Sequence, residues 1–411
     1  MIIKEFEYLQ YRDKNQLHYI EEKTFEVLEK FILENEETAQ YLKITTKKGH
    51  GKVLQAQNYV GVIQTKDGTT IEILPKISNL KDDVKTEDNP KPKTKEQKSK
   101  EILIKMLKTL KNSPFKNFNV ANVQSSKMPL LEIFISMFLE ELSKLIKRGI
   151  KSDYITQEEN LKFLKGKLLI GEQIKHNTIH KERFFVQYQE FRSDRVENRL
   201  IKTTLQYLYK KSKSNKNQQR IREFLFVFDE IEISYDIKND FSKVKLNRQM
   251  KDYEQVLLWC KTFLLENSFS PYKGNDVAFA LLFDMNLLFE SYVGDYLKKK
   301  GFDVSLQDTG KYLVESHNKF ALRPDIVINR KTEGKTVIIA DTKWKNITEE
   351  KDISQADMYQ LFAYGKKYNN NQLYLIYPKN DKNQPKLKYN YCNQSNSKLN
   401  LKVLYFDLAK R

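Results

Sequence analysis

The sequence predicts a multi-domain α+β protein that ends in an α/β domain with a central mixed sheet. Apolar residues alternate near the N-terminus, recur at helical spacing in the middle, and form short strands between helices near the C-terminus. The 411 residues suffice for two or three domains. We expect an N-terminal α+β region at 1–110, a mainly helical region at 111–268 and the α/β domain at 269–411.

The N-terminal region is predicted to combine a helix with a β-hairpin. In "TFEVLEKFILEN", residues 24–35, apolar residues recur at helical spacing. Residues 58–77, "NYVGVIQTKDGTTIEILPKI", alternate on two arms around the turn signal Asp67-Gly68. Residues 78–100 are dense in charge, contain two prolines and have few apolar side chains, so we expect a flexible insert there.

The middle region is predicted to be mainly helical. The segments with helical apolar periodicity are 101–110, 128–150, 195–210 and 252–269. Residues 160–175 and 183–191 look more like strands. We expect Arg195 and Arg199 of "RVENRL" to pair with acids of their own helix, such as Glu197, rather than to bind a partner.

Composition favours a polyanionic partner and a reducing compartment. The chain has 72 Lys and Arg against 54 Asp and Glu, a net charge of +18, which favours nucleic acid. A lysine-rich proteome explains the same charge, so charge alone names no function. Cys260 and Cys392 are too few for a disulfide framework or a cysteine zinc site. No apolar run suits a membrane span and no signal-peptide pattern follows Met1, so we expect a cytoplasmic protein without a membrane partner.

The α/β domain is predicted from about residue 270 onward. Residues 275–300 are expected to form one long helix that ends before Gly301. The strand patterns that follow lie at 302–308, 312–316, 323–330 and 336–344. A helix is expected at 353–369, and strands at 372–378 and 398–408.

This domain carries one constellation that indicates catalysis. In "VIIADTKWK", alternation puts Asp341 and Lys343 on one face of the strand, and Asp325 begins the preceding strand after Pro324. The spacing fits a hairpin, which brings both carboxylates to one edge of the sheet. Carboxylates suit Mg²⁺, and a lysine beside them orients water and stabilises negative charge. The chemistry indicated is phosphodiester hydrolysis.

Two helices add candidate residues. Glu290 lies in the apolar context "LLFESYV", where a lone acid is costly unless it is paired or bound. A helix-surface acid is the alternative interpretation. In the following helix Gln360 is a second candidate, with Tyr364 on the same face and expected to pack. His317 is expected to be a strand-end residue rather than a base, and Trp344 is expected to pack in the core.

These residues resemble a known nuclease motif. "RPDIVINR" followed by "ADTKWK" is similar to the PD-(D/E)xK motif, with Asp325, Asp341 and Lys343 at the motif positions. Glu290 matches its helical acid, and "QLFAY" from Gln360 is similar to its Q-x-x-x-Y element. More narrowly, "GVIQTKDGTTIEILPKI", "LKGKL", "ENRLIKTTLQYL", "LLFESYV" and "DTKWK", in that order, resemble the McrC family, the nuclease subunit of McrBC-type modification-dependent restriction systems.

The resemblance implies a restriction-endonuclease-like domain at 269–411 and a Mg²⁺-dependent DNA endonuclease subunit of antiviral defence, with Mn²⁺ as a substitute metal. It implies that Asp325, Asp341 and Glu290 bind metal and that Lys343 and Gln360 also act in catalysis. It further implies a partner, an AAA+ GTPase of the McrB type, which forms a hexameric ring, binds the GTP and recognises modified DNA. The N-terminal region is the candidate surface that binds this ring and stimulates its NTPase.

Two other functions stay open from the residues alone. One is a catalytically silent adaptor that binds DNA and regulates an NTPase ring, against which the intact Asp325, Asp341 and Lys343 argue. The other is a stand-alone nuclease of the same fold, which Mg²⁺-dependent cleavage without a motor would favour.

Overall fold

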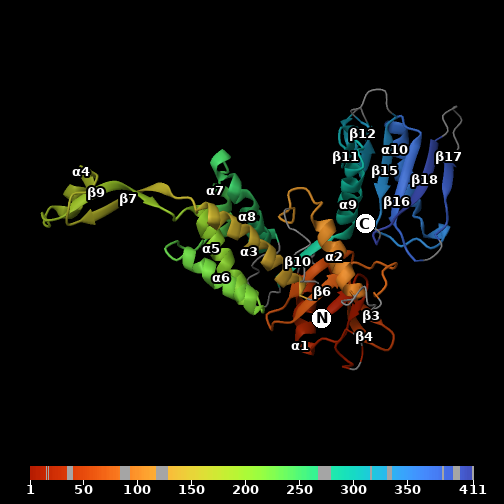
Figure 1. Cartoon of the computed structure of the whole chain (residues 1–411), viewed down its shortest axis with the longest axis horizontal. Helices are drawn as coiled ribbons and strands as arrows, with labels where there is room; N and C mark the ends of the chain where they lie inside the picture. The colour runs from red at the N-terminus through yellow and green to blue at the C-terminus, as the bar shows by residue number, and fades with distance from the viewer. Residues whose placement is uncertain are drawn as a thin grey trace. The chain divides into compact units, whose positions relative to one another are not determined.

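The described residues form five β-sheets with helices packed beside them, which agrees with the predicted α+β class. The computed structural model describes residues 1–14, 16, 18–34, 40–83, 93–116, 128–266, 279–314, 317–330, 336–381, 384–391 and 399–409. The chain forms two compact units, Met1–Leu130 with Phe269–Arg411, and Leu131–Ser268. Figure 1 shows the elements of both. The three predicted domain ranges divide the chain more finely and stay a prediction.

Two sheets share a core in the N-terminal part of the first unit. The first sheet contains, in spatial order, β1 (Ile2–Lys4), β6 (Thr70–Leu74), β5 (Tyr59–Gln64) and β10 (Phe279–Asp284). The second contains β2 (Tyr8–Leu9), β4 (Gly51–Ala56) and β3 (Leu42–Lys47). The predicted helix is α1 (Glu22–Glu34), and its buried Phe25 and Leu28 join the core of both sheets. The predicted β5–β6 hairpin is confirmed.

β10 is a strand where the sequence predicted a helix. It pairs antiparallel with β5, and the helix begins only afterwards, as α9 (Met285–Lys299). Asp284 caps α9, because its carboxylate accepts a hydrogen bond from the N–H of Asn286 at 2.7 Å. The prediction of a helix is wrong for 279–284, because pairing with a distant strand outweighs the local helical pattern. The helix that carries Glu290 therefore starts at the end of an edge strand of the N-terminal sheet.

α2 (Lys95–Leu107) begins inside the predicted flexible insert. Thr94 and Gln97 form a capping box at its start. Lys100 is buried in this helix, and its ammonium lies 2.6 Å from the carboxylate of Glu72 in β6. The prediction of a flexible insert is therefore wrong for residues 95–100, while 84–92 lie outside the described residues.

The α/β domain has the predicted mixed sheet. Its strands are, in spatial order, β11 (Val304–Leu306), β14 (Ile326–Ile328), β15 (Ile338–Thr342), β16 (Gln372–Pro378), β18 (Leu399–Phe406) and β17 (Lys388–Tyr391). β15, β16 and β18 run parallel, and the other neighbours pair antiparallel. α9 packs against β11 and β15, and α10 (Gln355–Lys367) packs against β15 and β16 (Figure 1). Both helices thus contact β15. A separate small hairpin consists of β12 (Lys311–Val314) and β13 (Lys319–Leu322).

The second unit is a group of helices that carries a long β-hairpin. Its helices are α3 (Leu130–Arg148), α5 (Val196–Lys211), α6 (Asn215–Val227), α7 (Ile237–Lys243) and α8 (Lys251–Lys261). α5 packs against α6, α7 and α8, with Tyr253 and Trp259 of α8 fully buried. None of the described helices is long and apolar enough to span a membrane.

The long hairpin, residues 153–192, extends away from the helices of its own unit in Figure 1. It is formed by β7 (Asp153–Leu161) and β9 (Phe184–Arg192), with β8 (Lys167–Leu168) and α4 (Ile170–Asn177) between them. The strand prediction for 160–175 is thus wrong for 170–175, which are helical. The large apolar side chains exposed on this hairpin are Tyr154, Phe163, Leu164, Ile170, Ile174, Ile179 and Phe191.

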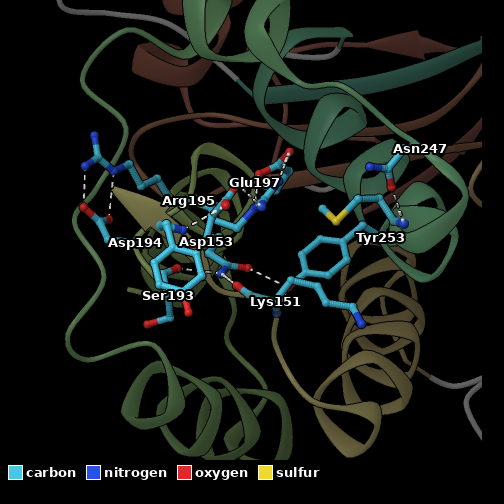
Figure 2. Close-up of polar contacts among 12 residues, drawn as sticks. Lys151, Asp153, Ser193, Asp194, Arg195, Glu197, Asn247 and Tyr253 are labelled. Atoms are coloured by element: carbon cyan, nitrogen blue, oxygen red, sulfur yellow. Dashed lines mark hydrogen bonds and ion pairs between the residues drawn. The ribbon is translucent and has the colours of Figure 1, made fainter. Parts of the chain in front are cut away.

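Polar contacts hold the base of the long hairpin against α5 and α8 (Figure 2). The ion pairs of this base are Arg195–Asp153, Arg195–Glu197 and Arg199–Asp194. The buried Asn198 accepts a hydrogen bond from the hydroxyl of Tyr253 at 2.9 Å. The expected pairing of Arg195 with Glu197 is confirmed, whereas Arg199 pairs with an acid that precedes its helix.

Candidate active site

The β14–β15 hairpin places Asp325 beside Asp341. Ile326 pairs with Ala340, so the two aspartates that flank this pair lie opposite each other. The Oδ2 atom of Asp325 accepts hydrogen bonds from the N–H and the hydroxyl of Thr342, at 2.8 and 2.9 Å. The predicted hairpin is confirmed, although residues 331–335 between its two strands lie outside the described residues.

Asp341 is fully buried, with 0% of its surface exposed. Its Oδ2 lies 2.6 Å from Nζ of Lys343, whereas its Oδ1 accepts no hydrogen bond from the described groups. Burial raises the pKa of Asp341 to about 7, repulsion from Asp325 adds to the rise, and attraction to Lys343 opposes it. A buried carboxylate oxygen without a partner is costly. A cation bound there would remove that cost.

Lys343 has a fixed backbone and a partly exposed ammonium. Its N–H donates to the carbonyl oxygen of Ile376 at 3.0 Å, which continues the contact between β15 and β16 beyond the last strand residue. Burial lowers the pKa of Lys343, but attraction to Asp341 and Asp325 outweighs burial and raises it above the usual value. Lys343 is therefore positively charged at neutral pH and suited to donate hydrogen bonds.

Glu290 of α9 is the third acid of the site. It is 5% exposed, and its Oε2 accepts a hydrogen bond from Nε2 of Gln307 at 2.6 Å. Burial raises the pKa of Glu290 to about 7, and repulsion from Asp325 contributes to the rise. Gln307 also donates its backbone N–H to the carbonyl oxygen of Asp325 at 3.0 Å, and its φ is +49°. Gln307 thus links the helical acid to the hairpin, a role that its sequence context does not signal.

α10 contributes polar groups from the other helix. Repulsion from Asp357 also raises the pKa of Asp341, although burial and repulsion from Asp325 raise it more. Gln360 donates its side-chain N–H to the hydroxyl of Tyr364 at 2.6 Å. That hydroxyl donates to the carbonyl oxygen of Arg323 at 3.1 Å, and Tyr364 is buried, as expected for a packing residue. The catalytic role of Gln360 stays a prediction.

The oxygen ligands present fit Mg²⁺. Among the residues that the structure describes, no three His, Cys, Asp or Glu side chains form a metal-binding group. Mg²⁺ needs only one or two carboxylates, because waters and phosphate oxygens complete its octahedral shell. Asp341, with its unpartnered Oδ1, and the adjacent Asp325 supply such a pair. Metal binding by Asp325 and Asp341, and Glu290 as a third ligand, stay predictions.

Trp344 follows Lys343 and connects the site to more distant segments. It packs on Phe289, with ring centroids 5.4 Å apart, but it is only half-buried, so the expected core position is met in part. Its backbone N–H donates to Oδ1 of Asn286 at 3.2 Å, and its indole N–H donates to both oxygens of Glu5 at 3.0 and 3.1 Å. The sequence does not predict these contacts of Asn286 and Glu5. His317 lies exposed between β12 and β13.

Comparison with known proteins identifies the family of this chain. The model of a family described as McrBC 5-methylcytosine restriction system component matches residues 54–378. No curated protein matches the sequence.

Two solved structures resemble the fold. One is a half-complex from a tetradecameric assembly of Thermococcus gammatolerans McrB AAA+ hexamers with bound McrC. The matched chain is 18% identical with a TM-score of 0.68, and the match covers 99% of this chain and 94% of that one. The other is the Thermococcus gammatolerans McrBC complex, at 20% identity and a TM-score of 0.50, covering 73% and 87%. Because the family match covers most of the sequence, this chain belongs to the family of McrBC 5-methylcytosine restriction system components.

Proposed function

We propose that this chain is the Mg²⁺-dependent DNA endonuclease subunit of a McrBC-like restriction complex. The observation that carries the proposal is the arrangement around Asp341, a buried carboxylate with one unpartnered oxygen beside Asp325 and the ammonium of Lys343. An ordinary structural ion pair does not need a second carboxylate at the same place, because like charges raise each other's pKa. A site that binds a divalent cation does need it.

Each residue has a role that follows from its position. Asp325 and Asp341 hold the metal, and Glu290 stands beside them on α9, oriented by Gln307. When bound, Mg²⁺ activates a water and neutralises charge that develops on the phosphate. Lys343 is positively charged at neutral pH, so it orients the attacking water and stabilises the phosphate in the transition state.

The proposed partner is an AAA+ GTPase of the McrB type, which binds the GTP and recognises modified DNA. Two features support it, namely the family and the likeness in fold to chains from McrBC complexes. In this proposal the chain stimulates the NTPase of the ring and cuts modified foreign DNA only in the assembled complex.

The long hairpin is a second candidate for the surface that binds the ring, beside the predicted N-terminal region 1–110. It exposes large apolar side chains, among them Phe163, Leu164 and Ile179, the last 87% exposed. Exposed apolar groups clustered on one element indicate a surface that another protein covers.

A reconstitution experiment tests the proposed function. The chain, an AAA+ GTPase of the McrB type, GTP and Mg²⁺ are combined with modified and unmodified DNA, and both cleavage and GTP hydrolysis are measured. We expect cleavage of modified DNA only in the complete mixture, with Lys343→Ala inactive and the exposed Asp381→Ala as an active control. Cleavage by the chain alone would indicate a stand-alone nuclease instead. Stimulated GTP hydrolysis without cleavage would indicate a silent regulator.

A further inference from the structure

A pocket of about 190 Å³ opens beside the candidate active site. Its lining includes Lys76, Trp344, Lys345 and Lys379. Two of them directly follow Lys343 in the chain, and Lys379 directly follows β16, which runs parallel to β15. Ligands of open α/β sheets bind at the carboxyl ends of parallel strands, which is where this pocket lies.

A buried carboxylate joins two walls of this pocket. Glu5 is fully buried and accepts a hydrogen bond from the backbone N–H of Lys76 at 2.8 Å. The same carboxylate accepts the indole N–H of Trp344. Pro75, the residue before Lys76, is held as well, because its carbonyl oxygen accepts a hydrogen bond from the hydroxyl of Ser99 in α2 at 3.0 Å. These hydrogen bonds therefore hold the backbone around Lys76 against the residues that follow β15.

Three ammonium groups around the pocket can donate hydrogen bonds to an anion. Lys76, Lys345 and Lys379 are all exposed lysines. Lys379 lies 3.2 Å from the carboxylate of Asp407, and Lys345 donates to the carbonyl oxygen of Asp352. Carboxylates also lie near the other two ammonium groups, because Glu5 attracts Lys76, and Asp352 and Asp357 attract Lys345. Each exposed ammonium nevertheless has three N–H donors, so the three lysines together can donate hydrogen bonds to a phosphate in the pocket.

We propose that this pocket binds a backbone phosphate of the DNA strand next to the cleavage site. The proposal rests on the proposed nuclease function and adds a role for the N-terminal part of the chain. It assigns a function to the segment "IEILPKI", residues 71–77. This segment belongs to no catalytic motif, but it contains Lys76. In this arrangement DNA contacts the N-terminal sheet and the nuclease sheet at once.

DNA binding measured without metal tests this proposal separately from catalysis. The full-length chain is titrated onto a labelled duplex in EDTA at several salt concentrations, and Kd is obtained from fluorescence anisotropy. Each phosphate contact contributes about 0.9 to the slope of log affinity against log salt. For Lys76→Gln we expect binding about three- to tenfold weaker, with the slope reduced by about one. Lys76→Arg, which keeps the charge, is expected to bind like the wild type.

Lys43→Gln is the matched control, because Lys43 is an exposed lysine of β3 outside the pocket. We expect it to change Kd less than twofold, since exposed charges are screened over about 10 Å at 0.1 M salt. Equal losses for Lys76→Gln and Lys43→Gln, or a wild-type chain that does not bind DNA, would overturn the proposal.

Inorganic phosphate at constant ionic strength distinguishes a DNA site from a site for the free anion. We expect no competition below about 10 mM phosphate, because a single mobile anion lacks the other contacts of the DNA strand. Competition at micromolar phosphate would contradict the DNA assignment. A loss specific to Lys76→Gln in a chain that cuts no DNA would retain the pocket as a DNA contact and reject the nuclease.

Discussion

Asp341→Asn is expected to stabilise the metal-free chain at alkaline pH. Asp341 has its pKa raised by burial and by repulsion from Asp325, from 3.8 to about 7. The folded state therefore keeps the proton up to about pH 7, whereas the unfolded chain releases it near pH 4. Because the folded state binds the extra proton, stability falls as pH rises through this window. A shift of about three pKa units corresponds to about 4 kcal/mol of destabilisation above pH 7.

Asparagine has nearly the same shape but no charge, so it avoids this cost. In the variant, the charges of Asp325 and Asp357 still attract Lys343, which limits the destabilisation caused by losing Asp341 as its partner. Urea unfolding of both proteins in EDTA, at pH 5 and pH 8, measures the difference in free energy of unfolding. We expect the variant to be more stable by about 2–4 kcal/mol at pH 8, and by much less at pH 5.

Added Mg²⁺ provides the second half of this test. A ligand that binds only the folded state stabilises it by about 2.7 kcal/mol at a hundred times its Kd. We expect Mg²⁺ at pH 8 to stabilise the wild type and to leave Asp341→Asn nearly unchanged. A difference between the proteins that does not depend on pH, or a variant less stable at pH 8, would refute the reasoning.

Three further predictions concern the rest of the chain. Gly61→Ala is expected to lower the free energy of unfolding by about 3 kcal/mol or more, because φ of Gly61 is +141° and the new Cβ would lie 1.9 Å from the carbonyl oxygen of Leu281. Thermal unfolding measures this loss, and Gly171→Ala, whose Cβ would meet no close contact, is the control. Lys100→Ala is expected to lower the free energy of unfolding in urea by about 3–5 kcal/mol, since it leaves the buried Glu72 without its cation. A loss below about 1 kcal/mol would contradict this. Replacing the tip of the long hairpin with a short turn is expected to abolish GTPase stimulation while the unfolding temperature stays within a few degrees; retained stimulation would exclude the hairpin as the ring-binding surface.

The centre of the candidate site could be predicted because its parts are close in sequence. Asp325 directly precedes β14 and Asp341 lies in the adjacent β15, so the period of two and the hairpin spacing place them together. Lys343 follows from the same alternation. The capping box at Thr94 and Gln97 was also visible in "TKEQ", and it would have predicted the start of α2 inside the expected insert.

The remainder depends on contacts that local sequence does not encode. Glu5 reaches Trp344 across 339 residues of sequence, and no periodicity connects the two. The run 279–283 is apolar on both faces, so it fits a helix as well as a strand until β5 is known to pair with it. Gln307 contacts Glu290 from an irregular segment with positive φ, where neither helix nor strand pattern applies.

Cleavage of modified DNA by the complex that contains Asp341→Asn tests the central claim most directly. The same preparation is first checked for folding, for DNA binding in EDTA and for stimulation of the partner's GTP hydrolysis. We predict that these three properties persist while the single-turnover rate of strand cleavage with Mg²⁺ falls at least about a hundredfold. Cleavage at the wild-type rate by this variant would contradict the assignment of the active site to Asp325, Asp341 and Lys343.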